Sequence, residues 1–351
     1  MNKITSTKLF DKCLGSLYGS IIGDAMGEPS EGLGIDGCDQ ECCKHFNSIE
    51  EKIGWINDFE GSGTDDTVLR DVLIESLVRT SGYANIDDWA EDWLANYDEF
   101  FAPKLKYFFM SVLYTANKLK RFRNPRMAAL GNIPCSSSAM CIAPVGLVNA
   151  CNPIQAATQA AHLASLINTH DGGFCQDGAA AIAAAVASAC QNDANVKGVL
   201  RDAVTYLPST SGARMKTAIN EIFEIAQTQS DYKSFRKQMH ENAKHFFQLE
   251  KTNSLETVPL TLALIFLAEG DLETSLIYAS NFGRDTDTMA AMAGAICGAL
   301  HGARTIKQEW KDKVKNSASK DQEQLSYGLT KAAIEKSANE AAARTRLDHL
   351  I

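Results

Sequence analysis

The sequence predicts an all-α protein, a compact multi-helix orthogonal bundle. Apolar residues recur at helical spacing through most of the chain. Two stretches, 153–166 and 179–190, are rich in alanine, which favours helix strongly. No convincing run of alternating apolar and polar residues, bounded by turns, indicates a strand. These three observations together favour helices packed on helices.

The predicted elements follow one another from the first apolar repeat to the polar end of the chain. The expected helices cover residues 9–22, 68–77, 153–166, 179–190, 217–226, 232–247, 258–268, 272–279 and 289–303. Loops are expected at 28–57, 121–138, 169–177 and 249–257, and the first is long enough to suggest a functional loop. Residues 307–351 predict one or two surface helices with a break at 317–321. We therefore expect one all-α domain over 1–305, with 306–351 as its C-terminal helical extension.

Composition and charge exclude several classes of protein. The 351 residues are 45% hydrophobic and 22% charged, and the net charge is −9. A net negative charge argues against a nucleic-acid or anionic-membrane partner. The first residues resemble no signal peptide, and no apolar run of about 18 residues predicts a membrane span. We expect a cytoplasmic protein, and the sequence does not specify its oligomeric state.

The ten cysteines show no regular framework spacing, which is typical of cytosolic thiols. One cluster contains Cys38, Cys42, Cys43 and His45. Its spacing matches no common zinc pattern, so packed thiols are favoured over a zinc site.

Small residues recur every fourth position in two predicted helices. Glycines occupy positions 15, 19, 23 and 27, and positions 294, 298 and 302, with Ala290 in step. Glycine costs about 1 kcal/mol relative to alanine inside a helix, so the spacing needs a reason. Small residues at i and i+4 let a second helix approach closely. We expect these two faces to pack tightly in the core, and packing against each other would bring Glu31 to the start of the later helix.

Two acidic clusters lie far apart in the chain, Thr64-Asp65-Asp66-Thr67 and Asp285-Thr286-Asp287-Thr288. Each opens a predicted helix, and a single such cluster is most often a helix cap. Two or three contiguous oxygen acceptors exceed what one cap needs, however, and hard divalent cations prefer such ligands. If the fold joins the clusters, the repulsion of their carboxylates favours a pair of Mg²⁺ or Mn²⁺ ions. A metal-dependent enzyme is the leading hypothesis.

The order of these motifs resembles the ADP-ribosylglycohydrolase family, which includes the dinitrogenase-reductase-activating glycohydrolase and the eukaryotic ADP-ribosylhydrolases. The resemblance covers about residues 10–303. The matching residues are the glycine-rich run 15–27, Pro29 and Glu31, the first acidic cluster, Ala143-Pro144-Val145-Gly146, Thr169-His170, and residues 283–288 running into the glycines at 294 and 298.

The resemblance implies a dinuclear Mg²⁺ or Mn²⁺ site in a central cleft of the bundle. It implies hydrolysis of the glycosidic bond at the anomeric carbon of ADP-ribose attached to a protein side chain or a small molecule. Glu31 matches an acidic residue of the family's metal cleft, and either Glu31 or Asp66 would act as the catalytic base. The implied metal ligands are Thr64, Asp65, Asp66, Asp285, Asp287 and Thr288.

The resemblance also implies residues that bind the substrate. His170 matches a position that lines the ADP-ribose cleft. Independently of the resemblance, backbone amides and hydroxyls that could hold a diphosphate are offered by Gly131, Asn132 and Ser136-Ser137-Ser138. A plain flexible loop is the alternative.

Two departures from the family pattern keep alternatives open. Family members often carry a Gly-Asn-Gly stretch close to a Met-Arg pair, where this chain has a serine run, 136–138, and Met140-Cys141. Arg284 stands where better-studied hydrolases tend to have glycine, and it could pair with Asp285 or reach a phosphate. The alternatives are a hydrolase of another N-ribosyl compound and a non-catalytic protein that binds ADP-ribose.

Overall fold

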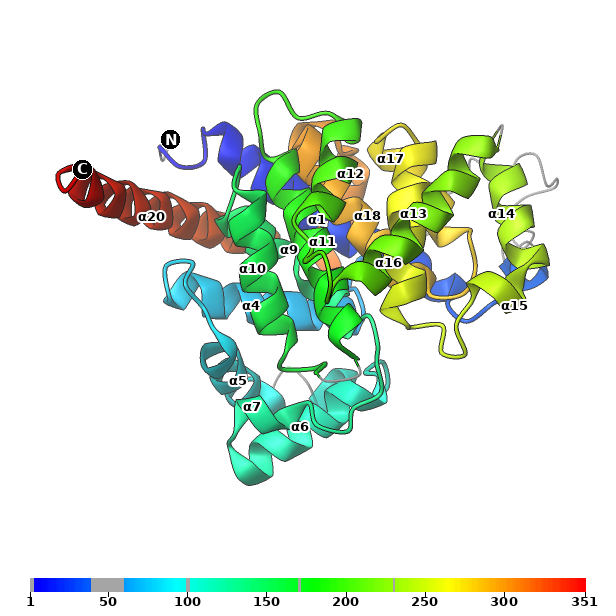
Figure 1. Cartoon of the computed structure of the whole chain (residues 1–351), viewed down its shortest axis with the longest axis horizontal. Helices are drawn as coiled ribbons and strands as arrows, with labels where there is room; N and C mark the ends of the chain where they lie inside the picture. Colours follow the sequence, from blue (N-terminus) through cyan, green and yellow to red (C-terminus); the bar gives the residue numbers. More distant parts are fainter. Residues whose placement is uncertain (1–2, 39–59, 99–101, 170–171, 230) are drawn as a thin grey trace.

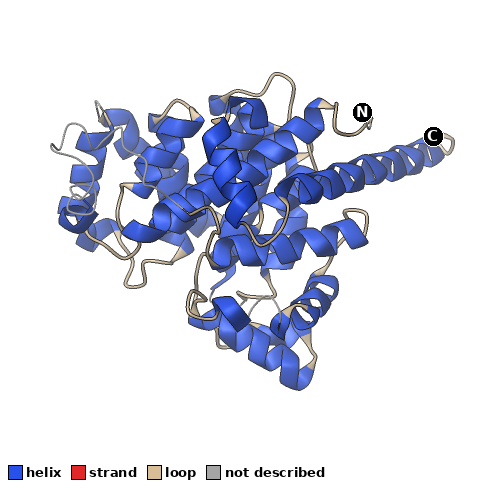
Figure 2. Cartoon of the chain, turned by 180° about the vertical axis from the view of Figure 1, so that it is seen from behind, coloured by secondary structure: helices blue, strands red, loops and turns tan. Residues whose placement is uncertain are grey.

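The computed structural model describes residues 3–38, 60–98, 102–169, 172–229 and 231–351, and within these ranges it contains helices and no strand. Figure 2 shows helices throughout the described chain, joined by short loops. The predicted all-α class is therefore confirmed.

The longer helices, in chain order, are α1 (Lys8–Gly27), α4 (Asp65–Arg79), α5 (Ile86–Ala95), α6 (Met110–Phe122), α10 (Pro153–Ala164), α11 (Gly173–Ala189), α12 (Val196–Thr205), α13 (Ala213–Thr228), α14 (Tyr232–Glu241), α16 (Ser254–Leu267), α17 (Leu272–Ser280), α18 (Thr286–His301), α19 (Gln308–Ser317) and α20 (Gln322–Asp348). The short helices are η1 (Glu28–Ser30), η3 (Ala102–Lys104), α7 (Pro125–Ala128), α8 (Ser137–Cys141), α9 (Ala143–Val148), α15 (Ala243–Phe246) and η5 (Ala303–Thr305).

Helices α1 and α18 lie against each other at the centre of the molecule (Figure 1). A Cβ added to Gly19 would lie 2.1 Å from the carbonyl oxygen of Gly294, so only glycine permits this approach. A Cβ on Gly27 would lie 2.4 Å from the Cα of Asp287, which shows that the helices run antiparallel. The prediction that the two small-residue faces pack on each other is confirmed. This packing sets the end of α1 beside the start of α18.

Four segments predicted as loops are partly helical, because local starting signals outweigh the onset of the apolar pattern. Residues 28–30 form η1 and residues 35–38 are helical, while 39–57 lie outside the described residues. Pro125 starts α7 within 121–138, as proline suits the first helical position. Helix α11 begins at Gly173, within 169–177. Asn253 caps α16, which begins at Ser254, four residues before the predicted start at 258.

Several helices were not predicted from the sequence, and two were joined into one. The unpredicted helices are α5, α6, α9 and α12. Helix α5 begins with a capping box of Asn85 and Asp88, a signal that could have revealed it. The helix expected over 232–247 ends at Glu241, and α15 follows after Asn242.

The C-terminal region forms α19 and α20, with the break between them where it was predicted. Helix α20 packs on α1, α4 and α9, and the residues beyond Lys336 are exposed. Figure 1 shows this end, in red, projecting from the body of the molecule. We propose on these contacts that 306–351 extends the domain formed by 1–305. Across the described ranges, no helix is both long enough and apolar enough to cross a membrane.

Candidate metal centre

Both acidic clusters sit at helix N-termini that meet near the end of α1. Thr64 is the N-cap residue of α4 and Asp285 that of α18, yet neither side chain makes a capping hydrogen bond to its own helix. The simple interpretation that these side chains are helix caps therefore fails here. The partial positive charge of two helix N-termini faces the cluster and favours anionic side chains there.

Asp24, in the last turn of α1, caps α4 from outside. Its Oδ2 accepts hydrogen bonds from the backbone N of Thr64 at 2.9 Å and of Thr67 at 3.1 Å. The hydroxyls of the same threonines donate to Oδ1 at 2.7 Å and to Oδ2 at 2.5 Å. Oδ2 thus accepts three hydrogen bonds and Oδ1 accepts one, so most of the acceptor capacity of this carboxylate serves α4. We infer that Asp24, which was not among the predicted site residues, positions the first acidic cluster.

The fold brings together carboxylates that are far apart in sequence. Oxygen atoms of Asp24, Asp66 and Asp287 lie within 4.8 Å of one another. Oxygen atoms of Glu31, Asp285 and Asp287 form a second group of the same size, so Asp287 is common to both. The expected meeting of Glu31 with the second acidic cluster is confirmed. The roles of these residues as ligands or base remain predictions.

The other predicted ligands lie at the same place. Asp65 is buried, and the negative charges of Asp24, Glu31 and Asp285 contribute to raising its pKa. Thr288 is buried, and its hydroxyl lies 3.8 Å from the sulfur of Met140. Their part in ion binding also remains a prediction.

Burial raises the pKa of every aspartate in the cluster. Loss of water is the main cause, and the charge of Asp24 raises the pKa of Asp65 and Asp66 further. The pKa of Asp287 is raised by burial and then by the charge of Asp285. For Asp285, burial outweighs the attraction of a nearby lysine, and the pKa rises to about 7. Carboxylates crowded in this way ionise readily only when a cation neutralises them.

The oxygen atoms of the acidic cluster fit a metal ion, as one oxygen each of Asp66 and Asp287 shows. Oδ1 of Asp66 and Oδ1 of Asp287 are buried and have no hydrogen-bond partner in the described part of the chain. A buried unpaired acceptor costs about 1–3 kcal/mol, and more when it is charged. A hard divalent cation would satisfy both atoms with the ligand type it prefers. The oxygen donors suit Mg²⁺ and Mn²⁺ equally.

Lys251 was missed at the sequence level, and Ser136, expected only as a phosphate-binding hydroxyl, contacts the second acidic cluster. Lys251 donates a hydrogen bond from its ammonium to Glu31, and its Nζ lies 3.9 Å from Oδ1 of Asp285. Burial alone would lower the pKa of Lys251, but the charge of Asp285 and the hydrogen bond to Glu31 raise it. The Ser136 hydroxyl donates to Oδ2 of Asp285 at 3.3 Å. Both residues lie in segments predicted as loops, and no sequence pattern links such segments to an acidic cluster.

Arg284 pairs with Glu256 and not with Asp285. The guanidinium donates from Nε to Oε1 at 2.7 Å and from Nη2 to Oε2 at 2.9 Å, and it lies over the ring of Phe247. Its backbone is in the left-handed region, with φ +73°, which glycine adopts more easily. The buried Glu256 carboxylate holds the guanidinium fork in a bidentate pair. A contact between Arg284 and substrate remains a prediction.

The residues expected to hold a diphosphate are mostly engaged with the protein. The Asn132 side chain donates to Thr115 and to the backbone oxygens of Ser111 and Ile167. Gly131 is exposed, with φ +74°. Ser137 and Ser138 are buried at the start of α8. Their contacts with substrate remain predictions.

Two expectations fall on residues that the structure does not describe. His170 lies outside the described residues. So do Cys42, Cys43 and His45 of the cysteine cluster, while Cys38 is buried.

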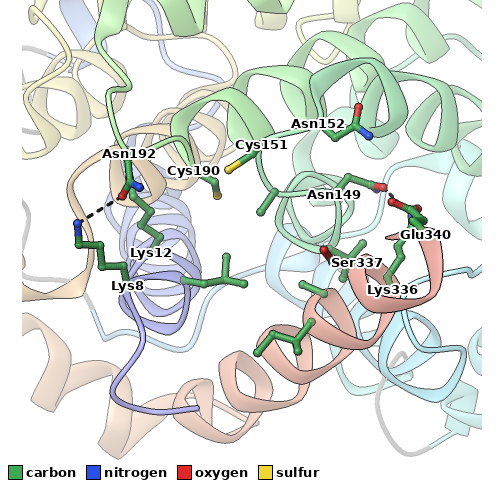
Figure 3. Close-up of a pocket in the computed structure, with 15 residues that line it drawn as sticks. Lys8, Lys12, Asn149, Cys151, Asn152, Cys190, Asn192, Lys336, Ser337 and Glu340 are labelled. Carbon is green, nitrogen blue, oxygen red and sulfur yellow. Dashed lines mark hydrogen bonds between the residues drawn. The ribbon is translucent and has the colours of Figure 1, made fainter. Parts of the chain in front are cut away.

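Two cavities lie at opposite ends of α1. One of about 390 Å³ opens beside Thr64 and is lined by Glu28, Glu60 and Tyr107 among others. A larger one of about 600 Å³, shown in Figure 3, lies near the start of α1, between Lys12 and α20. The ammonium of Lys12 is already bonded there to three backbone carbonyls. Of the first acidic cluster, Thr64 lines the smaller cavity.

Comparisons with known proteins agree with this architecture. A family model described as ADP-ribosylglycohydrolase matches residues 5–346. The uncharacterized protein YegU of Escherichia coli is 26% identical over 323 residues, covering 84% of this chain and 89% of that protein. Human ADP-ribosylhydrolase ARH3 is 24% identical over 323 residues, covering 84% of this chain and 87% of ARH3. A solved structure titled ADP-ribosylglycohydrolase-related protein complex shares the fold, with a TM-score of 0.63 at 18% identity over 93% of this chain and 99% of that one.

Proposed function

Because the chain belongs to the ADP-ribosylglycohydrolase family, we propose that it is a metal-dependent hydrolase that releases ADP-ribose from a protein side chain or a small molecule. One observation carries the proposal: buried carboxylates from three helices converge, and Asp66 and Asp287 each keep an oxygen free for a cation. Human ARH3, by its name an ADP-ribosylhydrolase, supports the same activity.

Asp66, Asp285 and Asp287 would hold two Mg²⁺ or Mn²⁺ ions, with Asp65, Thr64 and Thr288 completing the ligands. When bound, such ions supply Lewis-acid polarisation and lower the pKa of water. The carboxylates themselves offer negative charge to the oxocarbenium-like centre that forms as a glycosidic bond breaks.

Glu31 is the better candidate for the catalytic base. Its side chain is 35% exposed, so a substrate and an attacking water can reach it. Asp66 is 2% exposed and is better suited to hold an ion. A base must come within hydrogen-bond distance of the proton that it takes, which favours the accessible group.

The test is release of ADP-ribose from arginine-linked and serine-linked ADP-ribosylated substrates. It is run with Mg²⁺, with Mn²⁺ and with EDTA, and with Asp287→Asn beside the unmodified protein. We expect release that requires both the metal and Asp287, and the substrate that reacts identifies the linkage. Ion binding without release from either substrate would contradict the proposal and favour another N-ribosyl substrate or a binding role.

A further inference from the structure

The two groups of carboxylate oxygens differ in their access to a positive charge. Lys251 contacts Glu31 and Asp285, which belong to the group completed by Asp287. In the described part of the chain, no Lys, Arg or His forms an ion pair with Asp66 or Asp287. One group therefore contacts a cation that the protein supplies, whereas the other, which shares Asp287 with it, contacts none among the described residues.

Hydrogen bonds anchor the segment that carries Lys251 on both sides of this residue. The backbone N of Ser136 donates to the carbonyl oxygen of Thr252 at 2.6 Å. Glu256 accepts from the backbone N of Gln248 at 2.8 Å, and Arg284 holds Glu256 by its bidentate pair. The unusual Arg284 thus helps to fix the path of residues 248–256. Because hydrogen bonds hold the backbone on both sides of Lys251, its side chain starts from a fixed position beside Glu31 and Asp285.

We propose that Lys251 is an internal counter-ion that competes with a divalent cation for Glu31 and Asp285, so that the two ion sites of this protein differ in affinity. An ammonium and a divalent ion repel each other strongly at a separation of about 4 Å in a partly buried site. Within the described ranges, an ion held by Asp66 and Asp287 has no ammonium in direct contact with its ligands, and only the more distant charge of Lys251 acts on Asp287. The first ion binds tightly at Asp66 and Asp287. The second ion binds only when the ammonium of Lys251 moves away from Glu31 and Asp285.

This inference rests on the metal site of the proposed function but not on its reaction. It predicts a difference in ion binding that is measured without substrate. Failure to release ADP-ribose would therefore leave it standing, and uniform ion binding would overturn it whatever the activity.

The experiment titrates the full chain with Mn²⁺ alone and counts free Mn²⁺ by electron paramagnetic resonance. Three variants accompany the unmodified protein. Lys251→Met removes the charge and keeps much of the side chain's length, whereas Lys251→Arg keeps the charge. Lys237→Met removes a charge from an exposed lysine on α14 as the matched control. Thermal unfolding followed by circular dichroism verifies that each variant is folded.

We expect one tight and one weak site in the unmodified protein. Lys251→Met should tighten the weak site by about tenfold or more and leave the tight site nearly unchanged. Lys251→Arg and Lys237→Met should match the unmodified protein. In the absence of metal, Lys251→Met should also lower the melting temperature, because Glu31 and Asp285 lose their counter-ion.

Several outcomes would overturn the inference. Two unchanged affinities in Lys251→Met would show that the ammonium does not compete. Equal tightening of both sites would show that its charge acts on the cluster as a whole. Absence of Mn²⁺ binding in every variant would remove the ion sites altogether.

Discussion

At the scale of single residues, the site is a set of charges that the fold holds close against their repulsion. Asp66 and Asp287 each present one buried oxygen without a partner, and burial raises the pKa of both. The carboxylate of Asp24, in contrast, accepts four hydrogen bonds from Thr64 and Thr67 of the first acidic cluster. Asp24 therefore positions the site, whereas Asp66 and Asp287 each keep one oxygen available to a cation.

Asp287→Asn should have opposite effects on stability with and without metal. In metal-free protein it removes one repelling carboxylate, so the melting temperature should rise. In the unmodified protein, Mg²⁺ at a hundred times its dissociation constant should add about 2.7 kcal/mol to the free energy of unfolding, and the variant should lose most of this gain. Its activity should fall by at least ~100-fold, because even residues behind metal ligands cost 10–100-fold.

Thermal unfolding with Mg²⁺ and with EDTA measures both effects. The matched control is Asp193→Asn, which removes the same charge from an exposed loop. A full Mg²⁺-induced shift in Asp287→Asn would show that this carboxylate does not bind the ion.

Asp177 should make stability depend on pH. It is buried within α11, and burial raises its pKa from 3.8 to about 6 although the charge of Lys216 opposes the shift. The unfolded chain then loses its proton first, so the contribution of Asp177 to stability is complete below about pH 4 and is lost as pH rises toward 6. Asp177→Asn should be more stable than the unmodified protein at pH 7.

Urea unfolding of both proteins at pH 4, 5, 6 and 7 tests this. The difference in free energy of unfolding isolates Asp177 from the other acidic groups, which both proteins share. A difference that does not change with pH would contradict the expectation.

At the scale of elements, the pair of α1 and α18 places the chemistry. The glycine face removes the side chains that would separate the helices, and the end of α1 thereby reaches the start of α18. Asp24 then attaches the start of α4 to the same point. Three helix ends converge because one pair of helices packs without side chains between them.

Gly19→Ala should therefore be costly. The new Cβ would lie 2.1 Å from a backbone oxygen of α18, and a backbone atom cannot relieve the clash by changing rotamer as a side chain can. We expect a loss of about 3 kcal/mol or more in the free energy of unfolding, together with weaker metal binding.

The control for this change is Gly198→Ala in α12, where the nearest atom to an added Cβ is 3.6 Å away. It should stabilise by about 0.5–1 kcal/mol, because alanine is the better helix former. Urea unfolding measures both variants. Equal effects at the two positions would show that α1 and α18 separate more easily than their close approach implies.

At the scale of the whole molecule, α20 ties together regions far apart in sequence. Gln322 accepts a hydrogen bond from the buried Arg70, whose guanidinium also donates to the carbonyl oxygen of Leu17. The ammonium of Lys336 donates to the backbone of Gly82 and to the side chain of Asn149. These contacts end at Lys336, and the helix continues into solvent.

Two truncations should separate the two halves of α20. Removal of residues 341–351 should change the melting temperature by no more than about 2 °C, because those residues are exposed and make few contacts. Removal of residues 322–351 should cost more than about 3 kcal/mol, because it deletes the buried Leu329 and takes one hydrogen-bond partner each from Arg70 and Asn149. A large loss from the shorter truncation would reveal a role of the projecting end in the fold.

The sequence by itself determined the fold class, the presence of two glycine faces suited to close helix packing and the acidic composition of the site. Each of these is local: helical periodicity, small residues at i and i+4, and contiguous oxygen donors are visible in the order of the residues. Helix ends were harder to predict, because start signals such as Asn253 and Pro125 are single residues of types that occur in loops as well.

Only the tertiary structure decided which side chains share the acidic cluster. Asp24 caps a helix 40 residues away, Lys251 reaches Glu31 across 220 residues, and Arg284 turns to Glu256 instead of its neighbour Asp285. Contacts at such separations depend on how the helices pack, and no period in the sequence records them. The physical reason is that backbone propensity acts over a few residues, whereas charge and hydrogen-bond pairing act through space.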